Sequence, residues 1–566
     1  MAFVRMLPVA WIASLYAAIP LTLLIFFLNP ALSFKPSTLA SLVPLALWIS
    51  IPPAIFWPAG YRFIRIFARR RLRVRWFSSK YLLGFVVADL ILVSGLFWYN
   101  ANLLEALLPE AAALRLRMSA AWLTLGTLGL LVVACVKRWR SLAAVQLGAY
   151  LAAALLPVVM VPMRGGYTAE TPPRYAPELV SPSPQAPRIL LIGIEGATLD
   201  QVLPLVAQGK LPSLGKLLQR GAHGRLTSFR PCVSTVAWES LLTGKLPAKH
   251  QVLDALSYRL LFGAGEIRLA PRGFLFNRLA NLCGWAAAAQ GSEDSRALTV
   301  VQILNRLGYP SLILRGADST SAAPARSDIA LDRFLNPEIP TPPGTRELRE
   351  ELRRALREDE TAASQALQAW QGGRIRGLAV LLPGLDRVSH RFLRFAMPGS
   401  FGDVPRAEVE KYGRALEWYY RYLDEWIGRF LSADPGSGAG NGAEEQTLVL
   451  IVSPHGIDPL PLERRVLVAM EGDRFESGYH GRAPDGLLVV AGPGVAHGKP
   501  LGKASVLDVT PTLLYYFRLP IGRDMDGHPL TRIFQEDILA DTPLLLIPSY
   551  EASRLSGRPD EAPGSP

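Results

Sequence analysis

The sequence predicts a multi-domain chain, in which an N-terminal α-helical membrane bundle precedes a C-terminal α/β domain. Half of its 566 residues are hydrophobic, and the mean hydropathy of +0.22 is unusual for a wholly soluble protein. Residues 1–165 hold 16 basic and 3 acidic residues, whereas the rest holds 44 of each sign. From residue 188 onward, short apolar runs alternate with helix-like stretches, as in α/β proteins.

The charge distribution argues against a nucleic-acid partner. Binding a nucleic-acid polymer normally requires a basic face on the folded domain. The C-terminal part has no net charge, and the basic excess lies among the apolar segments of residues 1–165. We therefore expect membrane lipids, and not nucleic acid, beside the basic residues.

Residues 1–162 contain five apolar stretches and are expected to form a bundle of about five membrane spans. Each stretch is close to the ~20 residues that a helix needs to cross the hydrocarbon core. A signal peptide would explain the first stretch only. The second contains Pro52, Pro53 and Pro58, which predict a kink or a break. The stretches cover residues 8–28, 39–60, 81–104, 119–136 and 142–162.

Two basic loops predict the orientation of this bundle. Residues 62–80 carry eight basic residues and no acidic one, and residues 137–140 carry three basic residues. Short loops rich in Lys and Arg remain on the cytoplasmic side. With five spans, the N-terminus then lies inside, and the chain after residue 162 lies outside the cytoplasm.

Asp89 and the cysteines leave alternatives open. Asp89 falls near the middle of the third apolar stretch, where a carboxylate has a function or is neutral and hydrogen-bonded to a neighbouring helix. Cys135, Cys232 and Cys283 show no metal-type spacing. Two buried free thiols are favoured over a disulfide between Cys232 and Cys283.

The rest of the chain divides into a linker, a large domain and a tail. Residues 163–187 are rich in Pro, Ser and Gly, which predicts a linker. Residues 188–540 form the α/β domain, in which 251–345 are expected to be an accessory insertion that shapes the pocket. Residues 541–566 are expected to be a flexible tail. Buried strands are predicted at 188–194, 377–383, 447–453 and 486–491.

Two polar residues lie close to predicted element ends in the first part of this domain. Ligands of open α/β sheets bind beyond the carboxyl ends of the strands. Glu195 follows the first strand directly. Ser234 precedes a helix predicted to begin near Val236, and a helix N-terminus stabilises the alkoxide form of a hydroxyl. The alternative for Ser234 is an ordinary N-cap.

Further along, an aspartate and three histidines follow the same pattern. Asp386 and His390 are four residues apart, so a helix places them on one face, as two metal ligands require. His455 follows a strand, and His480 precedes one. Each alone is more often a loop residue than a ligand. Several such clusters in order predict a common site.

These clusters match a known family. Over residues 188–535 the domain resembles bacterial type I phosphodiesterase/nucleotide pyrophosphatase proteins of the alkaline-phosphatase superfamily. The resemblance implies an alkaline-phosphatase-like α/β sandwich, and a multi-pass protein of a bacterial inner membrane with this domain in the periplasm. The matching stretches are G-I-E-G-A-T, A-W-E-S-L-L-T-G, L-D-R-V-S-H, S-P-H-G, Y-H-G-R-A-P-D-G and V-L-D-V-T-P-T-L-L-Y.

The resemblance also implies the chemistry. Members of this family use two divalent metal ions, usually zinc, which clamp the attacking and leaving oxygens of a displacement at phosphorus. Carried over by position, Ser234 is the catalytic nucleophile. Asp386, His390 and His480 match the ligands of one metal, and Glu195, Ser234 and His455 match those of the other.

Two positions depart from the family's pattern. The family has Asp where this chain has Glu195, so the carboxylate reaches one methylene further. The family also has Asp directly before the histidine that corresponds to His455. This chain has Pro454 there, and its side chain offers no ligand. One metal site is therefore complete, and the second keeps three protein ligands, which can still hold a catalytic zinc.

Three functions are compatible with this pattern. The first is hydrolysis of phosphoric esters, diesters or pyrophosphates, by attack of Ser234 on a phosphorylated small molecule or a lipid or envelope head group. The second is transfer of a phospho-head-group within the cell envelope. The third, motivated by Glu195 and Pro454, is binding of a phosphorylated ligand without turnover.

Overall fold

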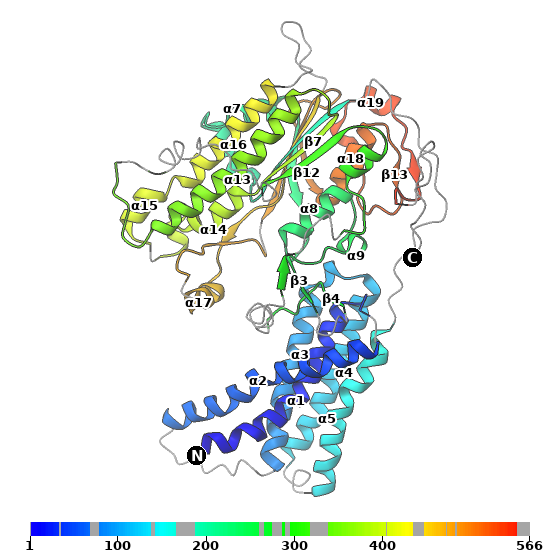
Figure 1. Ribbon diagram of the computed structural model, residues 1–566, viewed down its shortest axis with the longest axis vertical. Coiled ribbons are helices and arrows are strands. Elements are labelled where there is room, and N and C mark those ends of the chain that lie inside the picture. Colours follow the sequence, from blue (N-terminus) through cyan, green and yellow to red (C-terminus); the bar gives the residue numbers. More distant parts are fainter. Residues whose placement is uncertain are drawn as a thin grey trace, which may run out of the picture. The chain divides into compact units, whose positions relative to one another are not determined.

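The computed structural model divides into two compact units, of which the first contains Met1–Glu170 and Val252–Gln290 and the second contains the rest (Figure 1). Most of the predicted linker and of the basic loops lies outside the described residues. These are residues 2–32, 35–67, 79–136, 142–165, 187–259, 265–273, 286–288, 295–316, 335, 338–402, 404–433, 447–470, 473–481 and 484–551.

The first unit contains five long helices at the positions of the five apolar stretches. Four of them, α1, α3, α4 and α5, contain segments long and apolar enough to cross a membrane. In α2, which continues through four prolines as one helix, the apolar part Val43–Phe56 is shorter. Five spans therefore stay a prediction. The helices are α1 (Ala2–Leu28), α2 (Pro36–Phe67), α3 (Ser79–Leu103), α4 (Glu110–Cys135) and α5 (Ala143–Arg164).

The surface of these helices is largely apolar. Most of the exposed large hydrophobic side chains among the described residues lie on α1 to α5, including Phe56 and Leu125, which are 63% and 67% exposed. Hydroxyls such as that of Thr127 donate to the carbonyl four residues earlier, which satisfies them inside the bundle. Asp89 is buried within α3, and its role stays open.

The segment Val252–Gln290 forms part of the first unit although the domain chain surrounds it in sequence. The structure thus divides the region 251–345, expected to be one insertion, between the two units. Its share in shaping a pocket stays a prediction. Within the segment a three-stranded antiparallel sheet has the order β4-β3-β5, with β3 (Leu256–Arg259), β4 (Glu266–Ile267) and β5 (Ala286–Ala288).

Two asparagines at helix ends bind the backbone of this segment. Asn29, just after α1, accepts from the backbone amides of Arg268 and Leu269 at 2.8 and 3.0 Å and donates to the Leu269 carbonyl at 2.8 Å. Asn100, near the end of α3, accepts from the amide of Arg272 at 2.7 Å and donates to its carbonyl at 3.0 Å. The C-terminal ends of α1 and α3 therefore lie at the same end of the bundle.

The second unit is built on a seven-stranded mixed sheet in the order β12-β2-β11-β8-β1-β7-β6. Strand β1 pairs in parallel with β7 and β8, and β11 runs antiparallel to its neighbours β8 and β2. All four predicted strands are confirmed as β1, β7, β8 and β11. The strands are β1 (Arg188–Ile194), β2 (Ala222–Thr227), β6 (Ser311–Arg315), β7 (Gly377–Leu382), β8 (Thr447–His455), β11 (Asp485–Ala491) and β12 (Lys499–Ser505).

Helices pack on both faces of this sheet because its central strands are apolar on both sides. In β1, Leu190 and Ile192 join one buried cluster, and Ile189 and Leu191 join another. Helices α6 (Leu199–Ala207), α7 (Pro212–Arg220), α13 (Arg346–Gln371), α14 (Gly384–Ala396) and α16 (Ala415–Ser432) contribute to the first cluster. Helices α8 (Ser234–Thr243), α11 (Val300–Arg306) and α18 (Val509–Tyr516) contribute to the second.

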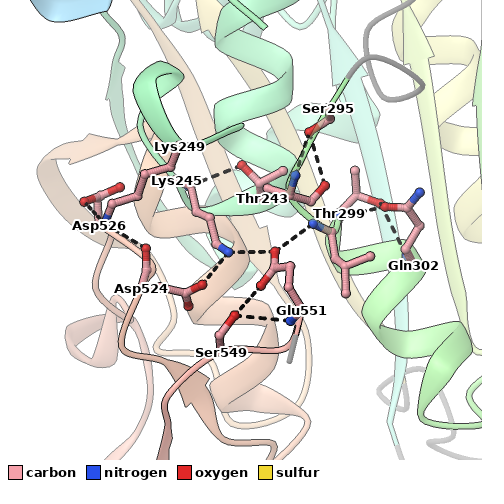
Figure 2. A network of polar contacts seen from close by, with 12 residues as sticks. Thr243, Lys245, Lys249, Ser295, Thr299, Gln302, Asp524, Asp526, Ser549 and Glu551 are labelled. Atoms are coloured by element: carbon pink, nitrogen blue, oxygen red, sulfur yellow. Dashed lines mark hydrogen bonds and ion pairs between the residues drawn. The ribbon is translucent and has the colours of Figure 1, made fainter. Parts of the chain in front are cut away.

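Helix α13 and the start of the predicted tail both pack within the second unit. α13 is rich in charged residues, yet one of its faces buries Leu348, Leu352 and Trp370. Beyond residue 540, β14 (Leu546–Ile547) pairs with β13 (Ile521–Gly522). Glu551 then bonds to Lys245 (Figure 2). The described residues thus extend to Glu551, past the predicted start of the tail at residue 541. Residues 552–566 lie outside the described residues.

Candidate active site

The candidate site lies where three parallel strands end. Glu195 directly follows β1, and His455 is the last residue of β8. Strand β7 leads into α14, whose first two turns carry Asp386 and His390 on one face, as predicted. Ser234 is the first residue of α8, two residues earlier than the helix start expected from the sequence. The carboxyl ends of neighbouring parallel strands bring these side chains to one edge of the sheet.

Ser234 lies between the ends of β1 and β8. Its Oγ is 2.8 Å from Nε2 of His455, whose Nδ1 donates to the carbonyl of Gly456 at 3.0 Å. The same Nε2 lies 3.6 Å from Oε1 of Glu195. Burial alone would raise the pKa of Glu195, but the adjacent imidazole outweighs it and lowers this pKa. His455 responds in the opposite direction: its carboxylate neighbours outweigh burial and raise its pKa.

Asp386, His390 and His480 form the second part of the site. Oδ2 of Asp386 is 3.6 Å from Nε2 of His390, and the His390 and His480 rings are 5.3 Å apart. Burial and the charge of Glu195 raise the pKa of Asp386 to about 6. Burial and the neighbouring histidines lower the pKa of His480 to about 4, so this imidazole is neutral at pH 7. Neutral imidazole is the form that binds metals.

The donor atoms fit divalent metal ions. Zinc binds imidazole nitrogen and carboxylate oxygen at about 2.0–2.2 Å, so two of its tetrahedral ligands lie roughly 3.4 Å apart. The pairs Asp386–His390 and Glu195–His455, at 3.6 Å each, are close to this separation. Oδ1 of Asp386 is buried and has no hydrogen-bond partner among the described residues. A bound cation would satisfy this atom.

Two groups of the described residues could each hold a metal ion. One is the expected set Asp386, His390 and His480, and the other combines Cys232 with His455 and His480. Within each group the ligand atoms lie within 4.8 Å of one another. Asp458 lies close to His455 in sequence, but it belongs to neither of these two groups of described residues.

Sequence reasoning missed two residues at this site. Glu476 accepts from Nδ1 of His390 at 2.6 Å, and its only sequence signal is a position four residues before His480. Cys232 was read as a buried free thiol, which it is in the structure. Burial raises the pKa of this thiol to about 12. Its proximity to Ser234 in sequence was the signal that could have placed it at the site.

Pro454 borders a small pocket beside His455. Cys232 and Arg230 also line this pocket, together with Asp485 on the neighbouring strand β11. Asp485 lies opposite His455 in the strand register, but its carboxylate pairs with Lys503 at 3.2 Å. Besides His455, the polar side chains that line this pocket are therefore a thiol, a guanidinium, an engaged carboxylate and the hydroxyl of Ser228.

The chain was compared with known proteins. Residues 189–259 match the family model of type I phosphodiesterase/nucleotide pyrophosphatase. The match includes Glu195, Cys232 and Ser234, while the other candidate residues lie beyond it. No curated protein matches the chain. The match supports a phosphoester hydrolase or a related member of its superfamily.

Proposed function

We propose that this protein is a membrane-anchored, metal-dependent hydrolase of phosphoric esters, diesters or pyrophosphates. The observation that carries the proposal is the position of Ser234. Its hydroxyl begins α8 and lies 2.8 Å from His455, among carboxylates and imidazoles that fit divalent cations. The match of residues 189–259 to a phosphodiesterase family supports the same chemistry.

In the proposed reaction, Oγ of Ser234 attacks phosphorus. The Oγ–P bond forms, the bond from phosphorus to the leaving oxygen breaks, and water later cleaves the phosphoseryl intermediate. Two divalent ions, proposed to be zinc, would lower the pKa of Ser234 and neutralise charge on the phosphoryl oxygens. Asp386, His390 and His480 would hold one, and Glu195, Ser234 and His455 the other. The free N–H groups at the start of α8 also stabilise negative charge on Oγ.

We further propose that the second unit works in the periplasm of a bacterium whose inner membrane holds α1 to α5. The four long apolar helices support the membrane anchor. The basic loop within residues 62–80 supports the orientation. The proposed substrate, a phosphorylated small molecule or a lipid or envelope head group, would be accessible from that side.

The test is phosphodiester hydrolysis by the full chain purified in detergent. Ser234→Ala should lower activity at least a hundredfold, because no other group replaces the nucleophile. Thr235→Ala, at the adjacent hydroxyl, is the matched control and should keep most of the activity. Equal background rates for wild type and Ser234→Ala, with no metal bound in elemental analysis, would refute hydrolysis.

Transfer of a phospho-head-group is the second candidate, because the chain joins this site to apolar membrane helices. Hydrolase and transferase share the phosphoseryl step and differ in the acceptor. If water is the acceptor, turnover of a lipid with a labelled head group should release the labelled phosphorylated head group into solution. Accumulation of a new labelled lipid or polymer, without release to water, would favour the transferase.

Binding of a phosphorylated ligand without turnover is the third candidate, motivated by Glu195 and Pro454. A variant Pro454→Asp restores a carboxylate next to His455 and tests it directly. Activity that appears only in this variant would indicate that the natural protein binds phosphorylated ligands without turnover. Activity present in the wild type would exclude that interpretation.

A further inference from the structure

Cys232 lies among metal-ligand atoms that come from three distant parts of the chain. It precedes α8 by two residues, whereas His455 ends β8 and His480 follows β10 (Gly478–Tyr479). Sγ of Cys232 and one ring nitrogen of each histidine lie within 4.8 Å of one another. The exposed fractions of Cys232 and His455 are only 7% and 2%.

Hydrogen bonds fix which nitrogen of each imidazole keeps its lone pair. Nδ1 of His480 donates to the backbone carbonyl of Cys232 at 3.1 Å, so its Nε2 keeps the lone pair. Nδ1 of His455 donates to Gly456, which leaves Nε2 of His455 as the ligand atom. The two rings stack with centroids 4.9 Å apart, and one nitrogen of each lies within 4.8 Å of the other and of Sγ. Such backbone contacts are the usual way in which proteins orient metal-binding histidines.

Among the described residues the thiol makes only a weak contact. Sγ of Cys232 lies 4.0 Å from Oγ of Ser228, the limit for a sulfur hydrogen bond. It lines the same pocket as Pro454, whose side chain offers no ligand atom.

We propose that Cys232, His455 and His480 bind a divalent cation of the zinc class through a thiolate and two imidazoles. One sulfur and two nitrogens favour zinc, cobalt or cadmium over magnesium, which prefers oxygen. Glu195, 3.6 Å from His455, is positioned to provide an oxygen as fourth ligand. On binding, the Sγ–metal bond forms and the thiol proton leaves to solvent.

This proposal deepens the proposed function, on which it rests for its role in catalysis, and it changes one assignment. The resemblance gives His480 to the ion held by Asp386 and His390. The thiolate cluster uses Nε2 of His480 for the other ion, because one ring nitrogen binds one ion at a time. Replacing His390 therefore distinguishes the two arrangements.

The experiment titrates the metal-free full chain in detergent with Co²⁺ and follows thiolate-to-metal charge-transfer absorption. The chain carries Cys135→Ser and Cys283→Ser, so Cys232 is its sole thiol. The band should appear, and Cys232→Ser should abolish it. His480→Ala should weaken Co²⁺ binding at this band at least tenfold, whereas His390→Ala should leave the band in place.

A chain that binds Co²⁺ without a charge-transfer band, and with equal affinity after Cys232→Ser, would overturn the proposal. Loss of the band in His390→Ala but not in His480→Ala would also overturn it. If a variant fails to fold, the single-thiol chain itself remains informative. Zn²⁺ should slow modification of Cys232 by a thiol reagent at least tenfold, while Mg²⁺ should not, and equal rates with both ions would contradict the site.

Failure of this proposal is separable from failure of the proposed function. Ser234→Ala should keep the charge-transfer band and lose hydrolysis. A band without hydrolysis in the wild type would refute the hydrolase and retain the thiolate site. Hydrolysis that depends on Ser234, without a charge-transfer band, would support the hydrolase and refute the thiolate site.

Discussion

At the scale of single residues, Glu476 holds His390 in position. Its Oε1 accepts from Nδ1 of His390 at 2.6 Å, which directs Nε2 toward Asp386. Arg391 lies 3.5 Å from the other oxygen of Glu476 and binds Asp473 as well. A carboxylate behind a histidine ligand fixes its tautomer and raises its basicity.

We therefore predict that Glu476→Ala lowers zinc affinity by roughly 10- to 100-fold, the usual effect of removing such a partner. Competition with a chromophoric chelator measures this affinity without using activity. Glu463→Gln, at an exposed position on α17 (Leu462–Met470), is the control and should not change it. Unchanged affinity in Glu476→Ala would show that the carboxylate does not support a metal ligand.

At the scale of elements, ion pairs attach the C-terminal segment to the turn that follows α8. Nζ of Lys245 donates to Asp524 and Glu551, at 2.7 Å each, and Lys249 bonds to Asp526 at 2.8 Å (Figure 2). Lys245 is only 5% exposed at its side chain. A buried ammonium ion requires such partners, so removing one of them is costly.

The pH dependence of this attachment follows from Glu551. Burial would raise the pKa of Glu551, but Lys245 outweighs it and lowers the pKa from 4.5 to about 2. A carboxyl with a depressed pKa stabilises the fold above its unfolded pKa and loses this effect as the pH falls toward the folded value. Glu551→Gln should therefore cost on the order of 2 kcal/mol at pH 7.

Thermal unfolding between pH 7 and pH 3 measures this difference. The gap in Tm between wild type and Glu551→Gln should be constant down to pH 4.5 and shrink below it. Glu536→Gln, at an exposed position on α19 (Glu536–Asp541), should show no such gap. A gap that is independent of pH would show that the carboxylate charge is not responsible.

The attachment of Val252–Gln290 within the first unit depends on Asn29 and Asn100. Replacing Asn29 with Leu removes two acceptor contacts and one donor contact to residues 268–269. Each lost hydrogen bond costs about 1 kcal/mol, and the exposed amides gain exchange with solvent.

Hydrogen exchange should therefore increase at the amides of Arg268 and Leu269 in Asn29→Leu. Asn305, which bonds to both backbone groups of Ser311 in the second unit, offers a matched control. Asn305→Leu should change exchange at Ser311 and leave the other two amides unchanged. Equal exchange in wild type and Asn29→Leu would contradict the proposed anchoring.

At the scale of the whole molecule, the helix ends of the first unit constrain its topology. The guanidinium of Arg164, at the end of α5, donates to the carbonyls of Phe26 and Asn29 at 2.9 and 3.0 Å. Asn100 and Asn29 bind the same short segment. The C-terminal ends of α1, α3 and α5 thus lie together, so these three helices run in the same direction.

Labelling in intact cells tests the predicted direction. In a chain without native cysteines, Ala31→Cys, just after α1, should react with a membrane-impermeant thiol reagent from outside the inner membrane. Arg71→Cys, in the basic loop, should react only after permeabilisation, because such loops remain in the cytoplasm. The reverse pattern would place the second unit in the cytoplasm and refute the proposed localisation.

The sequence by itself determined the features that depend on local pattern. Apolar runs of about seven residues marked β1, β7, β8 and β11, because strands buried on both faces exclude polar side chains. The helical spacing of Asp386 and His390 placed both on one face of α14. The six candidate residues do converge, although their roles stay proposals.

Only the tertiary structure decided contacts between residues distant in sequence. Glu476 reaches His390 across 86 residues, and Cys232 meets His455 and His480 because strand order brings three loops together. Likewise, Val252–Gln290 joins the long helices of the first unit through asparagine side chains, which composition does not reveal. Sequence periodicity reports burial along one element, whereas a site is made by the packing of several.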